Sequence, residues 1–321
     1  MHIDLKLGLS CNNACIHCIM EPVRLQLLRE TRKTDSSFQD VSSILNTVIE
    51  RGATSVTLTG GEPTLRKDFF DILQGLSQKN IAITVQSNGR RLSTPQAFER
   101  LQALARRDIL FVIALHADSA SIHDEITRVP GSFEETVRAI RALHELGFRL
   151  CGKMVLSRLN CQHIQGTLDL MQSLGFNEAV VAFPHAEEFT PEALEMVVPR
   201  YAQVREALSG LSSPFLKNVF WETIPYCQMP HPEFFRHSID LDFLRSSLNE
   251  EKTYIEMTMT GQHIDWEESR KEIKAKGACC AACLLEKVCE GVWEEYLPLH
   301  GEGDLIPITD IAQAEALWSS L

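Results

Sequence analysis

The chain has 321 residues, of which 44% are hydrophobic and 23% are charged, and its formal net charge is −12 at pH 7. This is the composition of an ordinary globular protein, which excludes a disordered, collagen-like or coiled-coil chain. The acidic balance argues against nucleic acid and anionic membranes as partners, because both are bound through clustered basic side chains. The length suits one large α/β domain or two domains of average size.

Short apolar runs in the first two-thirds of the chain predict buried parallel strands. They are Ile3–Leu9, Ser55–Thr59, Ile81–Gln86, Leu110–Leu115, Leu150–Leu156 and Ala179–Phe183. Amphipathic helical patterns separate them, at Phe38–Arg51, Arg66–Gln78, Thr94–Arg106, Ser132–Leu146 and Gln162–Leu174. This alternation predicts an α/β fold with a parallel sheet, either doubly wound or closed towards a barrel. Functional loops are expected at the carboxyl ends of its strands.

The pattern is less regular after Pro199. Tyr201–Leu211 predicts a helix and Val219–Ile224 a strand, whereas Phe234–Lys276 gives no clear assignment. From Cys279 onward the chain is rich in cysteine and is typical of a small appended module. The N-terminus lacks a secretory signal, and no stretch approaches the roughly 18 apolar residues of a membrane helix. We therefore expect a cytoplasmic protein.

Seven of the ten cysteines fall in two short clusters, which in the cytosol indicates metal or redox chemistry rather than disulfides. The first cluster, Cys11, Cys15 and Cys18, follows the first predicted strand. Its thiolates can ligate zinc, or three irons of a [4Fe–4S] cluster whose fourth iron stays open to an external ligand. Zinc would need a fourth ligand, which His17 is awkwardly placed to supply. A zinc loop and chance thiols are the alternatives.

The spacing of these three cysteines, with His17 directly before the third, resembles the radical S-adenosylmethionine (radical SAM) enzymes. A second motif at the end of the second predicted strand agrees with it and reads Gly60-Gly61-Glu62-Pro63. The resemblance implies a partial (β/α)6 TIM-like barrel in which this loop binds the amino group of the cofactor's methionyl part. Neither a Rossmann nor a P-loop glycine pattern is present in the sequence.

Further positions that the resemblance assigns to the cofactor follow later strands: Ser87, Asn88, His116 and Arg128. Arg128 would contact the cofactor carboxylate through a charge-assisted bond, the alternative being a solvated arginine. Two more side chains, Lys153 and Asn160, are candidates for the barrel interior, although a structural lysine is an equally open interpretation.

The second cluster, Cys280, Cys283 and Cys289, resembles the auxiliary-cluster extensions called SPASM or, when shortened, twitch. The resemblance implies that Cys227, upstream, completes a second [4Fe–4S] site. Cys279 is an alternative ligand in place of Cys227, and a structural zinc ribbon is the alternative for the whole site. We interpret the two remaining cysteines as buried or incidental thiols: Cys151 and Cys161.

The resemblance divides the chain into a core barrel (1–205), a bridging segment that contributes to the substrate site (206–278) and an auxiliary-cluster module (279–321). It implies that an external one-electron donor, such as flavodoxin or ferredoxin, reduces the first cluster. S-adenosylmethionine is then cleaved to a 5′-deoxyadenosyl radical, which abstracts a substrate hydrogen. The protein would orient the reactants and exclude water.

Relatives with such an extension commonly modify ribosomally made peptides, so we predict a thioether or C–C crosslink, or an epimerisation, in a peptide. The alternatives are radical oxidation or rearrangement of a small molecule (a nucleoside, sugar or cofactor precursor) and a non-catalytic iron–sulfur scaffold or electron carrier. Because the first strand begins near Ile3, we expect no N-terminal peptide-recognition domain. A separate recognition protein would then replace it.

Overall fold

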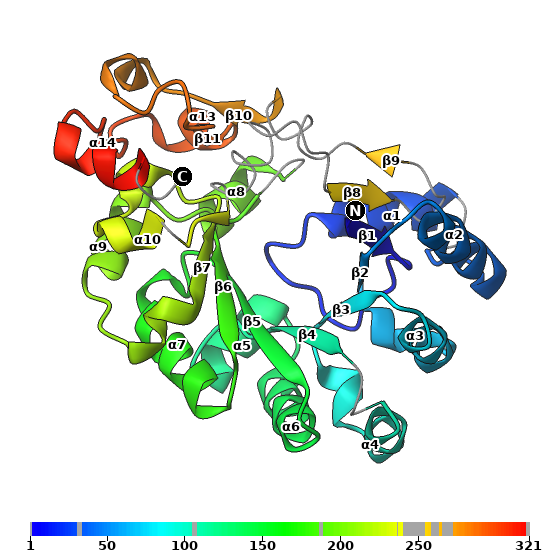
Figure 1. Ribbon diagram of the computed structural model, residues 1–321. Coiled ribbons are helices and arrows are strands. Elements are labelled where there is room, and N and C mark those ends of the chain that lie inside the picture. The colour runs from blue at the N-terminus through cyan, green and yellow to red at the C-terminus, as the bar shows by residue number, and fades with distance from the viewer. Residues whose placement is uncertain are drawn as a thin grey trace.

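The computed structural model describes residues 2–30, 34–104, 108–185, 189–235, 237–239, 254–257, 263–264 and 272–318. Its centre is a nine-stranded sheet with the order β7-β6-β5-β4-β3-β2-β1-β8-β9. The first seven strands are all parallel, and the sheet curls into a half-barrel (Figure 1). They are β1 (His2–Lys6), β2 (Ser55–Thr59), β3 (Ala82–Ser87), β4 (Ile109–Ala114), β5 (Arg149–Val155), β6 (Glu178–Ala182) and β7 (Val219–Glu222).

Helices α2, α3, α4, α6 and α7 lie around the outside of the curled sheet (Figure 1). The helices of the described residues are α1 (Met20–Glu30), α2 (Phe38–Glu50), α3 (Phe69–Ser77), α4 (Pro95–Gln102), α5 (Ala120–Thr127), α6 (Ser132–Glu145), α7 (Ile164–Ser173), α8 (Pro191–Val197), α9 (Tyr201–Ser209), α10 (Pro232–Phe235), α13 (Tyr296–His300) and α14 (Ile311–Trp318). Within those residues, no helix is both long and apolar enough to cross a membrane.

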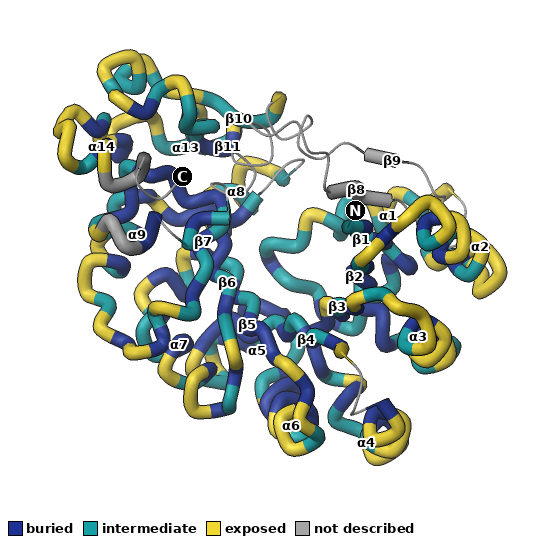
Figure 2. Tube along the Cα trace, in the orientation of Figure 1, coloured by how far each residue is buried: buried dark blue, intermediate teal, exposed yellow. Residues whose placement is uncertain are grey.

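The main core lies between the sheet and these outer helices, where Figure 2 shows the buried positions facing one another. Ile3 and Leu5 of β1 share one buried cluster with Val41, Leu45 and Val48 of α2. The alternate residues of β1 are only half-buried, because successive side chains of a strand point to opposite faces. The half-barrel therefore has an apolar outer layer and a more polar hollow inside.

The predicted parallel α/β half-barrel is confirmed, and all six predicted strands and the seventh at 219–222 are present. The first seven strands lie in sequential order, so the doubly wound alternative is wrong. The first strand ends at Lys6 rather than Leu9, because Leu9 bonds Thr34 instead of β2. Helix α1 was not predicted, since none of its residues is buried and it lacks a one-sided apolar pattern.

Two further strands extend the β1 edge of the sheet. β8 (Tyr254–Met257) pairs with β1 in parallel, and β9 (His263–Ile264) pairs with β8 in antiparallel fashion. Both fall in the segment 234–276, whose secondary structure the sequence pattern did not predict. Most of that segment lies outside the described residues.

Residues 272–318 form a small C-terminal module beside the β7 end of the sheet (Figure 1). Within it, β10 (Lys274–Ala275) pairs with β11 (Val292–Trp293) in antiparallel fashion. Tyr296 docks the module: its buried hydroxyl accepts a hydrogen bond from the Tyr201 amide at 2.9 Å and donates one to Asp304 at 2.7 Å. The rings of Phe183, Tyr201 and Tyr296 pack against one another. The module is therefore joined to the barrel through a satisfied polar contact within an aromatic cluster.

We expect Tyr296→Phe to weaken this docking while keeping the packed ring. The substitution leaves the buried Tyr201 amide without its acceptor, which costs about 1–3 kcal/mol in the free energy of unfolding. Urea unfolding of the anaerobic protein, together with amide hydrogen exchange at Tyr201, measures the effect. If both the stability and the Tyr201 exchange rate stayed at their wild-type values, the docking role would be wrong.

Candidate functional site

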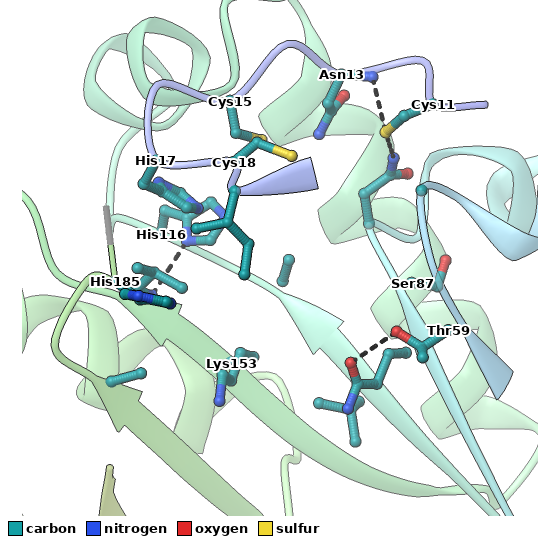
Figure 3. Close-up of a pocket in the computed structure, with 18 of the residues that line it drawn as sticks. Cys11, Asn13, Cys15, His17, Cys18, Thr59, Ser87, His116, Lys153 and His185 are labelled. Atoms are coloured by element: carbon teal, nitrogen blue, oxygen red, sulfur yellow. Dashed lines mark hydrogen bonds between the residues drawn. The ribbon is translucent and has the colours of Figure 1, made fainter. Parts of the chain in front are cut away.

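A cavity of about 390 Å³ opens at the carboxyl ends of the strands, where the sequence predicted the functional loops. One wall consists of the cysteine loop after β1 and the ends of β2, β3 and β4. The opposite wall comes from the ends of β5, β6 and β7 and from β11 of the C-terminal module. Figure 3 shows the cysteine loop on one side of this cavity, with Lys153 and His185 on the other.

Most residues predicted to contact the cofactor line this one cavity: His17, Gly60, Gly61, Glu62, Ser87, Asn88 and His116. The three cysteines of the first cluster line it as well. Two predicted residues lie elsewhere. Pro63 is buried at the start of a short 3-10 turn after β2. Arg128 ends α5 in a left-handed conformation (φ 57°) and borders a separate surface hollow with Asp124 and Pro130. The structure does not bring Arg128 to the other predicted contacts.

The cysteine loop carries three clustered, partly buried thiols on a backbone that is bonded to α5. The amides of Ala14 and Ile16 donate to the carbonyls of Thr127 and Ile126 at 3.0 and 2.9 Å. Burial, with the charges of Glu62 and Cys18, raises the pKa of Cys11 to about 11, and burial with the neighbouring thiols raises the pKa of Cys15 to about 12. The pKa of Cys18 is raised as well, mainly by burial. A cation that offsets this desolvation would release the protons and hold the thiolates.

Arg90 fixes the same loop from β3's side and was not found by sequence reasoning. Its guanidinium donates to the carbonyl of Asn12 and to the side chain of Asn13, and it pairs with Glu135 of α6. The side chain of Asn88 also donates to Asn12 at 2.8 Å. The loop position is thus set by an ion pair and amide contacts. These contacts join residues far apart in the chain, so no sequence motif predicts them.

Gly60 and Gly61 let the loop after β2 lie directly on the backbone after β1. The Gly61 amide donates to the Gly8 carbonyl at 2.8 Å, and the Glu62 amide donates to the Ser10 carbonyl at 2.7 Å. A Cβ on Gly60, whose φ is +123°, would meet the Gly8 oxygen at 2.2 Å, and one on Gly61 would meet the Ser10 oxygen at 2.4 Å. Only glycine allows this approach, which leaves bare backbone along the cavity wall.

Glu62 is buried and ties the ends of β2 and β3 together. Its carboxylate accepts hydrogen bonds from the side chain and amide of Thr64, from the Ser87 hydroxyl at 2.8 Å and from the Asn88 amide at 2.7 Å. Burial raises the pKa of Glu62, and these hydrogen bonds oppose the rise. Three of the four bonds end on Oε1, so Oε2 keeps acceptor capacity beside the cavity.

Three histidine rings form a column that starts in the cysteine loop: His17 is partly buried, and His116 and His123 are buried. His17 meets His116 edge to face at 4.7 Å, and His116 stacks on His123 at 5.7 Å. Burial lowers the pKa of all three, to about 4 for His17 and His123, so the rings are neutral at pH 7. Asn160, a candidate for the interior, instead bonds the His116 carbonyl from a fully buried position. Cys15 and the rings of His17 and His116 bring possible metal-ligand atoms within 4.8 Å of one another.

The opposite wall contains Lys153, which the sequence analysis named as a candidate for the barrel interior, together with Glu222, His185 and Thr223, which it did not name. Lys153 of β5 forms an ion pair with Glu222 of β7, and both line the cavity. His185, which follows β6, stacks on Trp293 of the C-terminal module at 4.2 Å. Thr223 adopts a left-handed backbone (φ 56°) that is uncommon for a β-branched residue, and its hydroxyl donates to Phe183. Glu222 is a polar residue at the end of a predicted strand, where functional side chains were expected, and that position was the one sequence feature that could have identified it.

The second group of predicted metal ligands also meets at one place. A small cavity of about 30 Å³ between the C-terminal module and the turn Tyr226–Gln228 is lined by all four: Cys227, Cys280, Cys283 and Cys289. Gly291 borders it in a left-handed conformation, and its amide donates to the Cys289 sulfur at 3.4 Å. Cys279 does not line this cavity. Cys151 and Cys161 are buried elsewhere in the barrel, as the sequence predicted.

Comparisons with known proteins agree with this geometry. The sequence profile described as the Radical SAM superfamily matches residues 5–171, which is 167 of the 321 residues. Residues 5–171 include both the cysteine loop and the Gly-Gly-Glu-Pro loop.

Similar curated proteins have several different activities. The chain is 27% identical over 166 residues to the AdoMet-dependent heme synthase of Oleidesulfovibrio alaskensis, covering 52% of this chain and 41% of that protein. It is 30% identical over 143 residues to the mycofactocin maturase MftC of Mycolicibacterium smegmatis, covering 44% and 34%. It is 30% identical over 179 residues to a probable GTP 3′,8-cyclase of Saccharolobus islandicus, covering 54% of each. The chain thus spans about half or less of these relatives.

Solved structures share the fold over nearly the whole chain. SuiB of Streptococcus suis, bound to S-adenosylmethionine, superposes with a TM-score of 0.62 at 17% identity, covering 97% of this chain and 76% of SuiB. The structure of anSMEcpe with bound AdoMet gives a TM-score of 0.59 at 14% identity, covering 99% and 92%.

The close approach at Gly61 gives a sharp test of the site geometry. We expect Gly61→Ala to displace the cysteine loop, because the new methyl group would meet backbone atoms that cannot rotate away, at a cost of about 1–3 kcal/mol. Gly75→Ala in α3 is the matched control, since nothing lies within 4 Å of its Cβ position. Thermal unfolding and maleimide labelling of the loop cysteines measure the effect. Equal behaviour of the two variants would show that the approach is not needed.

Proposed function

Because the chain belongs to the Radical SAM superfamily of enzymes, we propose that it uses S-adenosylmethionine to modify a ribosomally made peptide by radical chemistry. One observation carries the proposal: three convergent thiols and a bare Gly-Gly backbone lie on one wall of a single cavity, opposite a wall of different chemistry. Family membership implies a [4Fe–4S] cluster and S-adenosylmethionine.

The residues present fit these groups. Cys11, Cys15 and Cys18 offer three thiolate ligands, which leaves one iron of a cluster open. Gly60 and Gly61 line the cavity with backbone alone, held against the chain after β1 by an approach that a Cβ would prevent. When bound, the two groups supply the one-electron cleavage of a sulfur–carbon bond and the radical that removes a substrate hydrogen.

The chain's own part is to hold and orient. We propose that Glu62 Oε2 and the Gly60–Gly61 backbone receive the cofactor's amino group, while Ser87 and Asn88 set the carboxylate of Glu62 in place. The neutral rings of His17 and His116, which meet edge to face, line the same wall and need no counter-charge. The assignment of Arg128 to the cofactor carboxylate stays a prediction, since it lies outside the cavity.

A peptide substrate is favoured by the size of the cavity. At about 390 Å³ it stands at the small end of the range for ligand sites, so S-adenosylmethionine would occupy most of it. A substrate would then insert one small group, such as a side chain, and keep the rest outside. Similar proteins support this: SuiB has been solved with its precursor peptide SuiA, and MftC is a maturase.

The small-molecule alternative rests on relatives named as a GTP 3′,8-cyclase and heme synthases. A triphosphate requires several cationic groups around it. Among the described residues that line the cavity, Lys153 is the one lysine, and arginine is absent. This wall therefore favours a substrate with little negative charge over a nucleotide.

We propose that the C-terminal module, together with Cys227, holds a second [4Fe–4S] cluster, as in twitch-like extensions; the module's ligands would be Cys280, Cys283 and Cys289. Their convergence on one small cavity supports this ligand set over one that includes Cys279. Four thiolates suit zinc equally well, so a zinc ribbon is the competing occupant. A flavodoxin- or ferredoxin-type donor would supply the electron, and a separate protein would recognise the peptide.

The chemistry is tested by incubating the anaerobic, dithionite-reduced protein with S-adenosylmethionine and measuring 5′-deoxyadenosine. We expect 5′-deoxyadenosine from the wild type and at least a hundredfold less from Cys18→Ala, because the cluster would lose a ligand. Cys161→Ala, at a buried thiol outside the cavity, should keep wild-type formation. Absence of 5′-deoxyadenosine from a wild-type protein with its full iron content would favour the non-catalytic scaffold.

The second site is tested by metal analysis. We expect about eight irons per wild-type chain and about four in Cys227→Ser, because one complete cluster is lost. Cys279→Ser is the matched control and should keep about eight, since Cys279 lies outside the small cavity. About four irons together with one zinc in the wild type would refute the auxiliary iron–sulfur cluster and support the zinc ribbon.

A further inference from the structure

Among the described residues, the wall opposite the cysteine loop carries one charged pair. Lys153 of β5 and Glu222 of β7 reach each other across β6, and each side chain is 30% exposed to the cavity region. Figure 3 places Lys153 across the cavity from the cysteines. Because the ammonium and the carboxylate are paired with each other, they present a dipole to the cavity but no net charge.

The residues around this pair are apolar, or carry charges of opposite sign that offset each other. Val155, Ala182 and Phe183 line the cavity beside it. The His185–Trp293 stack closes one side, and burial, helped by the charge of Lys274, lowers the pKa of His185 to about 4, so that the ring is neutral. The flanking charges have opposite signs: Lys274 lies 3.5 Å from the centre of the Trp293 ring, and Glu295 lies 3.5 Å from His185.

We infer that this wall, the Lys153–Glu222 wall, admits an uncharged side chain of the substrate peptide and rejects acidic and basic ones. The inference rests on the proposed peptide substrate and specifies which part of it enters. A neutral amide or apolar group can lie against the aromatic stack while the pair stays closed. An amide can also accept from Lys153 and donate to Glu222 at the same time.

A charged side chain of the substrate binds less favourably, because it competes with the ion pair. To bind, an acidic group would have to take Lys153 away from Glu222, and a basic group would have to take Glu222 away from Lys153. Either exchange breaks the half-buried Lys153–Glu222 ion pair and brings a like charge next to one of its members. Discrimination of about tenfold or more against both signs follows.

The experiment uses three blocked tripeptides, acetyl-Gly-X-Gly-amide, with X as Gln, Glu or Lys. Gln and Glu have the same shape, so their difference isolates charge. Binding to the protein, loaded with cluster and S-adenosylmethionine but not reduced, is measured by saturation-transfer NMR titration. We expect the wild type to bind the Gln peptide at least about tenfold more tightly than the other two.

The variants should switch this preference in opposite directions. Lys153→Met removes the ammonium from beside Glu222 and should strengthen binding of the Lys peptide about tenfold relative to wild type. Glu222→Gln removes the carboxylate that pairs with Lys153 and should strengthen binding of the Glu peptide by a similar factor. The double variant removes both charges and should again prefer Gln. Arg100→Met, which breaks an exposed ion pair with Asp71 on the outer surface, is the control and should leave the preference unchanged.

Iron content and S-adenosylmethionine binding of each sample show whether a variant has kept its fold and its cofactor wall. With both intact, equal or undetectable binding of the three peptides to the wild type overturns the inference. An unchanged order of affinity in both single variants overturns it as well. Either result leaves the radical chemistry standing, whereas absence of 5′-deoxyadenosine formation would remove the proposed function itself.

Discussion

The site depends on one backbone contact, where the loop after β2 lies on the chain after β1. In-register parallel pairing brings Lys6 opposite Thr59, and the next residues then meet as Gly61 to Gly8 and Glu62 to Ser10. Because peptide groups meet directly, the positions of the cysteine loop and of the bare Gly-Gly backbone are set together. Glu62 and Arg90 extend the same constraint to β3 and α6. A shift in the β1–β2 register would separate all of these groups.

Charge is handled differently on the two walls of the cavity. The cofactor wall buries thiols, neutral imidazoles and Glu62, whose pKa values are displaced by burial towards the uncharged forms. Such a wall is suited to receive a positively charged group and metal ions. On the Lys153–Glu222 wall, the two charges instead neutralise each other in an ion pair. The C-terminal module contributes Trp293 to this wall. Trp293 follows Cys289, a ligand of the proposed second cluster, by only four residues, so one short segment would connect that cluster with the cavity.

The sequence predicted what depends on local pattern and spacing. Buried parallel strands are continuous apolar runs, and thiols or glycines at short fixed intervals indicate their chemistry directly. It could not predict contacts between residues far apart in the chain, such as Arg90 with Asn12 or Lys153 with Glu222, because no periodicity relates them. Arg128 shows the converse: a motif gives the position in the chain, but the backbone at the end of α5 decides which hollow the residue borders.

The central claim is that the three thiols and the Gly60–Gly61 backbone form a single cofactor site. Pulsed electron paramagnetic resonance of the reduced protein with ¹⁵N-labelled S-adenosylmethionine tests it most directly. The account predicts coupling between the cluster and the methionyl nitrogen in the wild type and in Gly75→Ala, and its loss or weakening in Gly61→Ala. A reduced cluster in the wild type whose spectrum does not change when the cofactor is added would contradict the account.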